Sequence, residues 1–160
     1  VRRAKHWVLN NIADHGGDPD ILTVSGHSER AHLPTFLFDE KEAPSSVRAA
    51  LLLGGLYDLK PLQDSFLKPL IGITDEEVEA FSPMTRFHAS QTDVTILVGE
   101  METAPFHSQA ALFADRLTAQ GLPVTEAVLK GRNHMDSVRD IGSSQTPAGA
   151  LLRDLIKSTA

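Results

Sequence analysis

The sequence predicts an α/β fold in which a parallel sheet is flanked by helices. Short apolar runs suited to strands alternate with longer segments of helical periodicity, which is the pattern of parallel α/β proteins. One run, residues 47–53, is apolar without alternation, as expected for a central strand covered on both faces. The pattern contains about four such strands, and polar residues capable of chemistry follow them.

The predicted elements of the first half follow one another with clear boundaries. Apolar residues at three- and four-residue steps predict an amphipathic first helix, which Gly16 and Pro19 end. Gly54 and Gly55 end the apolar strand. In order, the elements are a helix over 1–12, a strand over 21–25, a helix over 31–38, a strand over 47–53 and a loop or short turn over 56–62.

The second half repeats the alternation. Thr74 and Glu77 have the spacing of a capping box. Gly121 ends the long helix, and Pro147 occupies the first position of the last one. In order, the elements are a short helix over 74–81, a strand over 94–98, a helix over 106–120, a strand over 124–129, a loop over 131–136 and a closing helix over 148–157.

The composition narrows the class of protein. The chain has 160 residues, 41% of them hydrophobic and 22% charged, with a net charge of −6, which indicates one ordinary globular domain. No basic stripe suggests a nucleic-acid partner, and no run approaches the roughly 20 apolar residues that span a bilayer. There is no cysteine for a disulfide or a thiolate metal site, and no leader is recognised. We therefore expect a cytoplasmic protein whose partner is a small-molecule substrate, with no nucleic acid and no membrane.

A serine stands at the turn between the first strand and the next helix. In residues 23–32 (TVSGHSERAH), Ser28 occupies the place of a nucleophile elbow, a strained turn that holds a hydroxyl over the sheet edge. Gly26 gives the backbone room two residues earlier. The second glycine of the usual Gly-x-Ser-x-Gly pattern is replaced by Arg30. A serine that merely caps a helix is the alternative interpretation.

Residues after the later strands complete a hydrolytic set. Ligands of parallel sheets bind beyond the carboxyl ends of the strands, and the chain order there is serine, acid, histidine, as in α/β-hydrolases. Ser28 needs a neighbouring base, and His134 suits that role, a surface histidine being the alternative. A carboxylate must orient the imidazole. We favour Glu102 for this role over Asp58, which commonly would bond its own loop.

At these positions the chain resembles the kynurenine formamidase (arylformamidase) branch of the α/β-hydrolase fold. That family carries a Gly-His-Ser-Ala-Gly-Ala-His-Leu elbow, a Ser-Gly-Val-Tyr/Phe-Asp-Leu segment, an acid loop of the form Gly-x-x-Asp-Ser-Pro-Glu-Phe-x-x-Gln and a final Gly-x-x-His-Phe/Met-Asp motif. The likeness covers essentially the whole chain. The matching residues are Gly26, His27, Ser28, Ala31, His32 and Leu33 in the elbow, Gly55 to Leu59 in the second segment, Gly99, Phe106 and Gln109 in the acid loop, and Gly131, His134, Met135 and Asp136 in the last motif.

Three departures from the family pattern bear on the site. Glu29 and Arg30 replace alanine and glycine in the elbow, so the long Arg30 side chain must swing outward or shift the turn. Glu102 stands where the family has aspartate. The family's opening strands and its His-Gly-Gly oxyanion loop have no counterpart. We therefore expect residues 1–160 to be the C-terminal part of a single α/β-hydrolase domain, with the missing N-terminal half as its partner and a homodimer as an open alternative.

The resemblance implies a serine hydrolase that cleaves N-formylkynurenine to kynurenine and formate through a formyl-enzyme, without a cofactor or a metal. In this reading Ser28 attacks the formyl carbon, His134 moves the proton, Glu102 orients His134, and the backbone N–H of Glu29 faces the oxyanion.

Tyr57 and Phe106 are candidates for an aryl pocket, although packing is the commoner role of such residues. The alternative functions are a carboxylesterase of broad specificity and a non-catalytic relative or fragment with a binding role.

Overall fold

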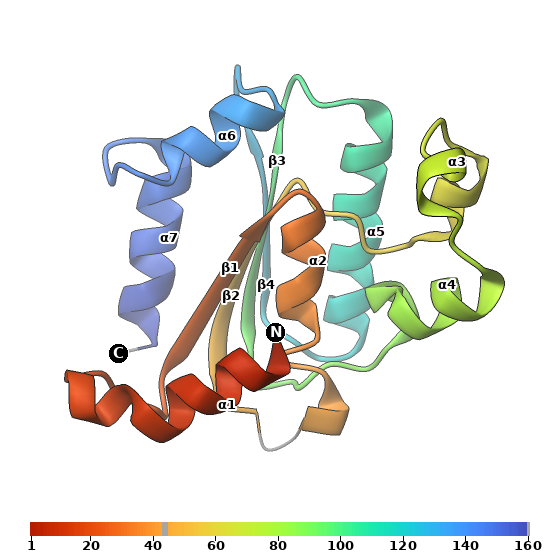
Figure 1. The fold of residues 1–160 in the computed structure, drawn as a ribbon. Coiled ribbons are helices and arrows are strands. Elements are labelled where there is room, and N and C mark those ends of the chain that lie inside the picture. The colour runs from red at the N-terminus through yellow and green to blue at the C-terminus, as the bar shows by residue number, and fades with distance from the viewer. Residues whose placement is uncertain (43–44, 160) are drawn as a thin grey trace.

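A four-stranded parallel sheet forms the centre of the chain (Figure 1). The computed structural model describes residues 1–42 and 45–159. All three strand pairings are parallel, and the strands lie in the sheet in the order in which they occur in the sequence. The predicted parallel sheet is therefore confirmed. Its strands are β1 (Leu22–His27), β2 (Val47–Leu53), β3 (Asp93–Gly99) and β4 (Val124–Leu129).

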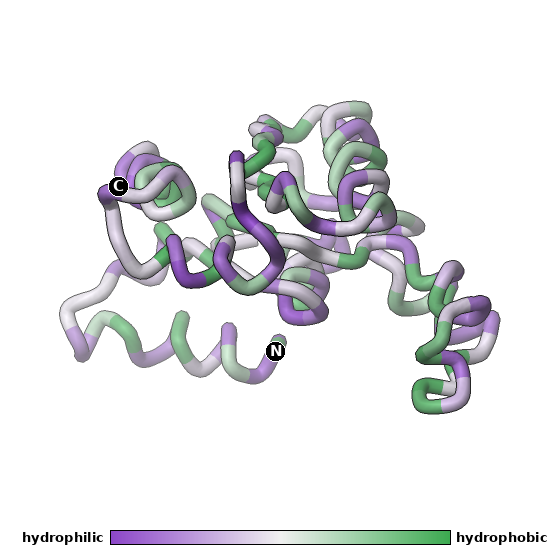
Figure 2. The backbone as a smooth tube through the Cα atoms, turned by 90° about the horizontal axis from the view of Figure 1, so that it is seen from above, coloured by the Kyte–Doolittle hydropathy of each residue, from purple (hydrophilic) through white to green (hydrophobic). Residues whose placement is uncertain are grey.

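Helices cover both faces of this sheet. Apolar residues of α2 and α5 join one core cluster, and those of α6 and α7 join the other (Figure 1). The α3–α4 region projects away from the body of the molecule (Figure 2). The helices are α1 (Arg2–Asn11), α2 (Glu29–Thr35), α3 (Lys68–Ile71), α4 (Asp75–Phe81), α5 (Ala104–Ala119), α6 (His134–Asp140) and α7 (Pro147–Ser158).

Strand β2 carries the centre of both cores. Ala50 and Leu52 pack on the α2–α5 side, and Leu51 and Leu53 pack on the α7 side, all with no exposed surface. Successive side chains of a strand point to opposite faces, so a strand buried on both sides needs apolar residues at every position. The uninterrupted apolar run predicted this central strand correctly.

Two helices differ from the prediction. Helix α1 forms, but its expected apolar face is not buried: Trp7 is 58% exposed, while Lys5 is buried and donates to the carbonyl oxygen of Leu37 at 2.9 Å. Helix α2 was expected over residues 31–38 but spans Glu29–Thr35. It begins earlier because Ser28 itself occupies the N-cap position.

The capping box predicted for Thr74 and Glu77 is present at the start of α4. The Thr74 hydroxyl accepts from the N–H of Glu77 at 3.2 Å, and the Glu77 carboxylate accepts from the N–H of Thr74 at 3.0 Å. Such reciprocal bonds satisfy two N–H groups that a helix start otherwise leaves without partners. The short helix thus has a defined beginning on the projecting region.

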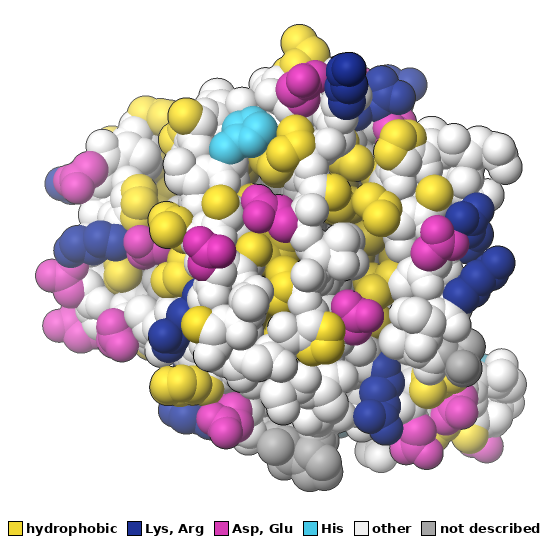
Figure 3. Space-filling view, turned by 180° about the vertical axis from the view of Figure 1, so that it is seen from behind, with side chains coloured by type: hydrophobic (Ala, Val, Ile, Leu, Met, Phe, Trp, Pro, Cys, Tyr) yellow, Lys and Arg dark blue, Asp and Glu magenta, His cyan; other side chains and the backbone are white. Residues whose placement is uncertain are grey.

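The surface carries mixed charges. On the face seen in Figure 3, lysine and arginine side chains are scattered among acidic and apolar ones and form no broad basic patch. None of the helices in residues 1–42 and 45–159 is long and apolar enough to cross a membrane.

A buried histidine lies within the core on the α5 side. His88 packs against Phe38 and Phe113, with ring centroids 5.2 and 5.5 Å away, and is 5% exposed. Among the described residues, neither of its ring nitrogens has a hydrogen-bond partner. Burial lowers the pKa of His88 from 6.5 to about 4, because the charged imidazolium would lose its hydration.

We predict that His88 makes the fold sensitive to acid. Between about pH 6.5 and about pH 4 the unfolded chain binds a proton at this histidine while the folded chain does not. Folding stability should therefore fall as the pH falls through this window, by an upper limit of about 3 kcal/mol from this residue. The free energy of unfolding, measured with urea at several pH values, should depend less on pH in His88→Leu than in the wild type. The control His15→Leu, at an exposed site, should show the wild-type dependence. An unchanged slope in His88→Leu would contradict the prediction.

Candidate active site

Ser28 occupies a strained turn at the carboxyl end of β1. Its φ is +60° and its ψ is −135°, and of the residues described it alone combines a side chain with a positive φ. Such a conformation costs on the order of 1–3 kcal/mol and persists only where the surroundings hold it. Two backbone bonds do so: Ser28 N–H donates to Leu53 at 2.9 Å, and Ala31 N–H donates to Ser28 at 2.9 Å.

Gly26 permits the helix after the turn to cross the strand closely. A Cβ atom at this position would lie 2.0 Å from the carbonyl oxygen of Arg30 and 2.8 Å from the Cα of Ala31, distances that no side chain allows. The Arg30 side chain itself is exposed. The sequence left open whether the Arg30 side chain turns outward or shifts the turn. In the structure it turns outward, and the turn is preserved.

A buried carboxylate binds the histidine that follows β4. Glu102 Oε2 lies 2.6 Å from His134 Nδ1, and Glu102 Oε1 accepts from the N–H of Gly99 at 2.9 Å. The Glu102 side chain is 1% exposed and that of His134 is 30% exposed. Gly54 makes room for the pair, since a Cβ there would lie 3.1 Å from both carboxylate oxygens and from His134 Cε1. The imidazole is thus held by one nitrogen, and its other nitrogen is left for chemistry.

His134 begins a helix rather than lying in a loop. The sequence predicted a loop over residues 131–136, but α6 starts at His134. The Asn133 side chain accepts from the N–H groups of Met135 and Asp136, each at 2.9 Å, which is the bonding of an N-cap residue. The asparagine directly before His134 was the signal that the prediction missed.

Asp58, the other candidate acid, is bound elsewhere. Its Oδ1 accepts from the N–H of Lys60 at 2.9 Å, which is the local role expected for an aspartate in a turn. The loop around Asp58 is fixed by Gln109, a buried residue of α5. The Gln109 side chain accepts from the N–H groups of Tyr57 and Asp58 and donates to the carbonyl of Asp58, each at 2.8 Å. The resemblance had marked Gln109 without giving it this role.

His27 ties the elbow to the helix that carries His134. Its Nε2–H donates to the carbonyl oxygen of His134 at 2.9 Å, and the two ring centroids are 4.4 Å apart. Burial, followed by the positive charge that His134 can carry, lowers the pKa of His27. His27 is therefore a neutral donor that fixes the backbone of His134 relative to Ser28.

The Ser28 hydroxyl is hydrogen-bonded to Glu29 and not to His134 in this structure. It donates to Glu29 Oε2 at 3.2 Å, and among the described residues no hydrogen bond joins it to His134. Both groups nevertheless border the end of β2, since Ser28 N–H is bound to Leu53 and the His134 ring touches Gly54.

A cavity of about 400 Å³ opens beside His134. Phe106 lines it, with its ring centroid 4.9 Å from that of His134. Tyr57, the other aromatic candidate, does not: it is fully buried and stacks on Phe113 at 4.2 Å in the hydrophobic core. The lining residues are Met101, Glu102, Thr103, Phe106, Asn133, His134, Met135 and Asp136.

Sequence comparison relates the chain to known hydrolases. No protein-family model matches it. It is 30% identical over 156 residues to the esterase LipQ of Mycobacterium tuberculosis, which covers 84% of this chain and 37% of that protein. It is 22% identical over 150 residues to the kynurenine formamidase of Danio rerio, covering 88% of this chain and 50% of that protein. The chain thus spans about a third to a half of the length of these curated relatives.

Solved structures share its architecture. A truncated carbohydrate esterase from gut microbiota superposes with a TM-score of 0.76 at 19% identity, covering 98% of this chain and 65% of that one. An arylesterase superposes with a TM-score of 0.70 at 19% identity, covering 96% and 57%. The chain has an α/β-hydrolase fold. In this fold the carboxyl ends of the strands form one edge, and Ser28, Glu102 and His134 all follow strands at that edge.

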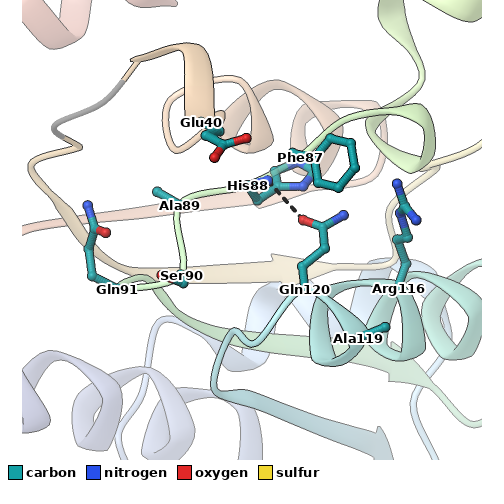
Figure 4. Close-up of a pocket in the computed structure, with 9 residues that line it drawn as sticks. All are labelled: Glu40, Phe87, His88, Ala89, Ser90, Gln91, Arg116, Ala119 and Gln120. Atoms are coloured by element: carbon teal, nitrogen blue, oxygen red, sulfur yellow. Dashed lines mark hydrogen bonds between the residues drawn. The ribbon is translucent and has the colours of Figure 1, made fainter.

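A second cavity, about 410 Å³ in volume, lies at the opposite end of the strands (Figure 4). Residues 87–91, which line it, precede β3 and so mark the amino ends of the strands. Gln120 closes one side, and its side chain accepts from the N–H of His88 at 2.8 Å and donates to the carbonyl of Arg86 at 2.9 Å. This cavity is separate from the serine site. Within the described chain, no three His, Asp or Glu side chains are grouped to hold a metal ion.

We predict that Gly26→Ala disrupts the elbow. The added methyl group would meet backbone atoms that cannot rotate away, so the crossing of α2 over β1 must open. Overpacking of this kind costs typically about 1–3 kcal/mol and more where backbone must move. Urea unfolding should show this loss. Gly142→Ala, whose new Cβ would lie 3.4 Å from the carbonyl oxygen of Arg139, should stay near the wild type. Equal stabilities for the two variants would contradict this account of the turn.

Proposed function

We propose that this chain carries the catalytic groups of a serine hydrolase that acts on carboxylic esters. The observation that supports it most is the buried Glu102–His134 pair beside the strained turn of Ser28. A serine hydroxyl is a weak nucleophile that needs an adjacent base, and the base needs a third group to fix its tautomer. The three residues offer these roles at one edge of the sheet. The esterase relatives support a carboxylic ester as the substrate.

In the proposed mechanism, the Ser28 side chain first turns from Glu29 toward His134. Oγ attacks the carbonyl carbon while His134 Nε2 takes its proton, and the bond between Glu102 and Nδ1–H stabilises the imidazolium. His134 then gives the proton to the leaving alcohol, whose bond to the carbonyl carbon breaks. A water molecule, deprotonated by His134, attacks the acyl carbon. The bond from that carbon to Ser28 Oγ then breaks, His134 returns its proton to Oγ, and the carboxylic acid is released.

The backbone N–H of Glu29 is the proposed oxyanion donor. It is the first N–H of α2, and among the described residues no acceptor is bound to it. A second donor is usual, and losing one costs on the order of 10²–10³ in rate. We propose that these residues work as the C-terminal part of an α/β-hydrolase domain whose opening strands supply that donor. The outer edge of β1, unpaired in the described sheet, and the greater length of the relatives support this.

A formamide is the second candidate substrate. The kynurenine formamidase match at 22% identity and the elbow and histidine motifs support N-formylkynurenine. The same triad would attack the formyl carbon, and His134 would protonate the leaving aryl amine. Release of kynurenine or of an aryl alcohol, measured side by side on the two substrates, distinguishes the candidates. A non-catalytic role is supported less, because the elbow keeps its geometry despite Arg30.

We predict that a fluorophosphonate probe labels Ser28. The probe reports a hydroxyl activated by a neighbouring base, so the adduct should appear on the peptide that contains Ser28 and should be absent in Ser28→Ala and His134→Ala. Ser25→Ala, an exposed serine on the same strand, serves as the matched control and should label like the wild type. Labelling that survives in Ser28→Ala would show that the nucleophile is assigned wrongly.

We predict that substitution of Glu102 lowers the hydrolytic activity much more than substitution of Asp58. Glu102→Gln keeps the shape of the side chain but favours the wrong histidine tautomer, so kcat/KM for an activated ester should fall by about 10²–10⁴. Asp58→Asn should change it by less than about threefold, because the Asp58 carboxylate bonds only its own loop in the described structure. A large loss in Asp58→Asn with little effect in Glu102→Gln would reverse the assignment.

A further inference from the structure

The Ser28 hydroxyl has beside it a carboxylate that the mechanism does not use. Glu29 Oε2 accepts from this hydroxyl at 3.2 Å, and the Glu29 side chain is exposed at the start of α2. Within residues 1–42 and 45–159, no lysine, arginine or histidine lies at ion-pair distance from the Glu29 carboxylate. A negative charge without a cationic partner therefore stands next to the nucleophile.

A substrate must approach this charge closely. In a reactive complex the carbonyl carbon lies about 3–3.5 Å from the attacking oxygen, so groups attached to that carbon come within several ångströms of Glu29. Two unit charges about 4 Å apart change an equilibrium by roughly fivefold even at the dielectric constant of water. The charge that a substrate carries near its scissile bond should therefore affect its rate measurably.

The charged side chains that line the cavity beside His134 are also negative. The described residues that line it include Glu102 and Asp136 but no lysine or arginine. Arg139, whose side chain is 80% exposed, lies 3.4 Å from Asp136 and offsets part of that charge, whereas in the described chain no cation is paired with Glu102 apart from His134 when it is protonated. The Phe106 ring adds a face that attracts organic cations. Because His134 protonates the leaving group, this cavity is on the leaving-group side of the proposed reaction.

We propose that Glu29 makes the site selective for esters whose leaving group carries a positive charge, such as esters of ammonium alcohols. This inference rests on the proposed serine hydrolase function and specifies its substrate class. The Glu29 carboxylate also disfavours the oxyanion, which would develop at the backbone N–H of the same residue. A cationic leaving group offsets that repulsion, whereas a neutral one does not.

The test uses two thioesters of matched shape and the complete natural protein. Acetylthiocholine carries a quaternary ammonium group, and S-(3,3-dimethylbutyl) thioacetate has a carbon atom in place of that nitrogen. At low salt, kcat/KM of the wild type should favour the cationic thioester by about fivefold or more. The preference should shrink in about 1 M sodium chloride, where the Debye length is about 3 Å.

Two variants remove the charge and one controls for it. Glu29→Gln and Glu29→Ala keep the backbone N–H, and both should lower the preference toward unity while raising the rate on the neutral thioester. Glu40→Gln changes the net charge equally but lies at the cavity at the opposite end of the strands (Figure 4), so it should keep the wild-type preference.

The outcomes separate this inference from the proposed function. Ser28-dependent hydrolysis with the same preference in Glu29→Gln, Glu29→Ala and wild type would overturn the role of Glu29 and leave the hydrolase assignment standing. The absence of Ser28-dependent hydrolysis of both thioesters and of activated esters would overturn both. A preference that Glu40→Gln abolishes equally would also overturn the role of Glu29, because net charge alone would then explain it.

Discussion

The hydrogen bond between Glu102 and His134 is the interaction on which the candidate site depends. A carboxylate that is almost fully buried is costly unless partners compensate for its lost hydration. Glu102 has two, the imidazole Nδ1 and the N–H of Gly99, and it therefore binds the turn after β3 to the start of α6. Gly54 brings the end of β2 against the same pair. One buried carboxylate thus joins the turn after β3 to the start of α6, beside the end of β2.

The first strand joins this group through backbone bonds. Ser28 N–H bonds Leu53 at the end of β2, and the side chain of His27 bonds the carbonyl of His134. Gly26 allows α2 to cross behind the turn, which keeps Ser28 in its unfavourable conformation. In this arrangement the backbone is fixed, and the Ser28 hydroxyl is the part left to move between Glu29 and His134.

The sequence predicts most of the fold because the strands bear strong patterns. The apolar run of β2 needs burial on both faces, and parallel α/β topology then brings the residues after each strand to one edge. The prediction failed where local chemistry competes with periodicity. Asn133 caps α6 directly at a segment expected to be a loop, and Trp7 lies on a helical stripe that the described residues leave exposed.

For the candidate site, the sequence predicts the types of residue but not how their side chains are placed. Residue order indicates a serine, an acid and a histidine, and the sequence favours Glu102 over Asp58, although both follow strands. The choice depends on where Gly54 and Gly99 allow a carboxylate to fit. Tyr57 illustrates the reverse case, since an aromatic residue near the site turns inward to the core. The bond between Ser28 and Glu29 depends on a rotamer, which no sequence pattern specifies.

In the proposed mechanism, one hydroxyl, one imidazole and one backbone N–H converge on a single reacting centre. A crystal structure of the protein after reaction with a phosphonate ester tests it most directly. We expect phosphorus bonded to Ser28 Oγ, the phosphoryl oxygen about 2.7–3.1 Å from the N–H of Glu29, and the His134 ring still bound to Glu102 and turned toward the adduct. A phosphoryl oxygen pointing away from that N–H, with the imidazole out of reach of the adduct, would contradict the claim.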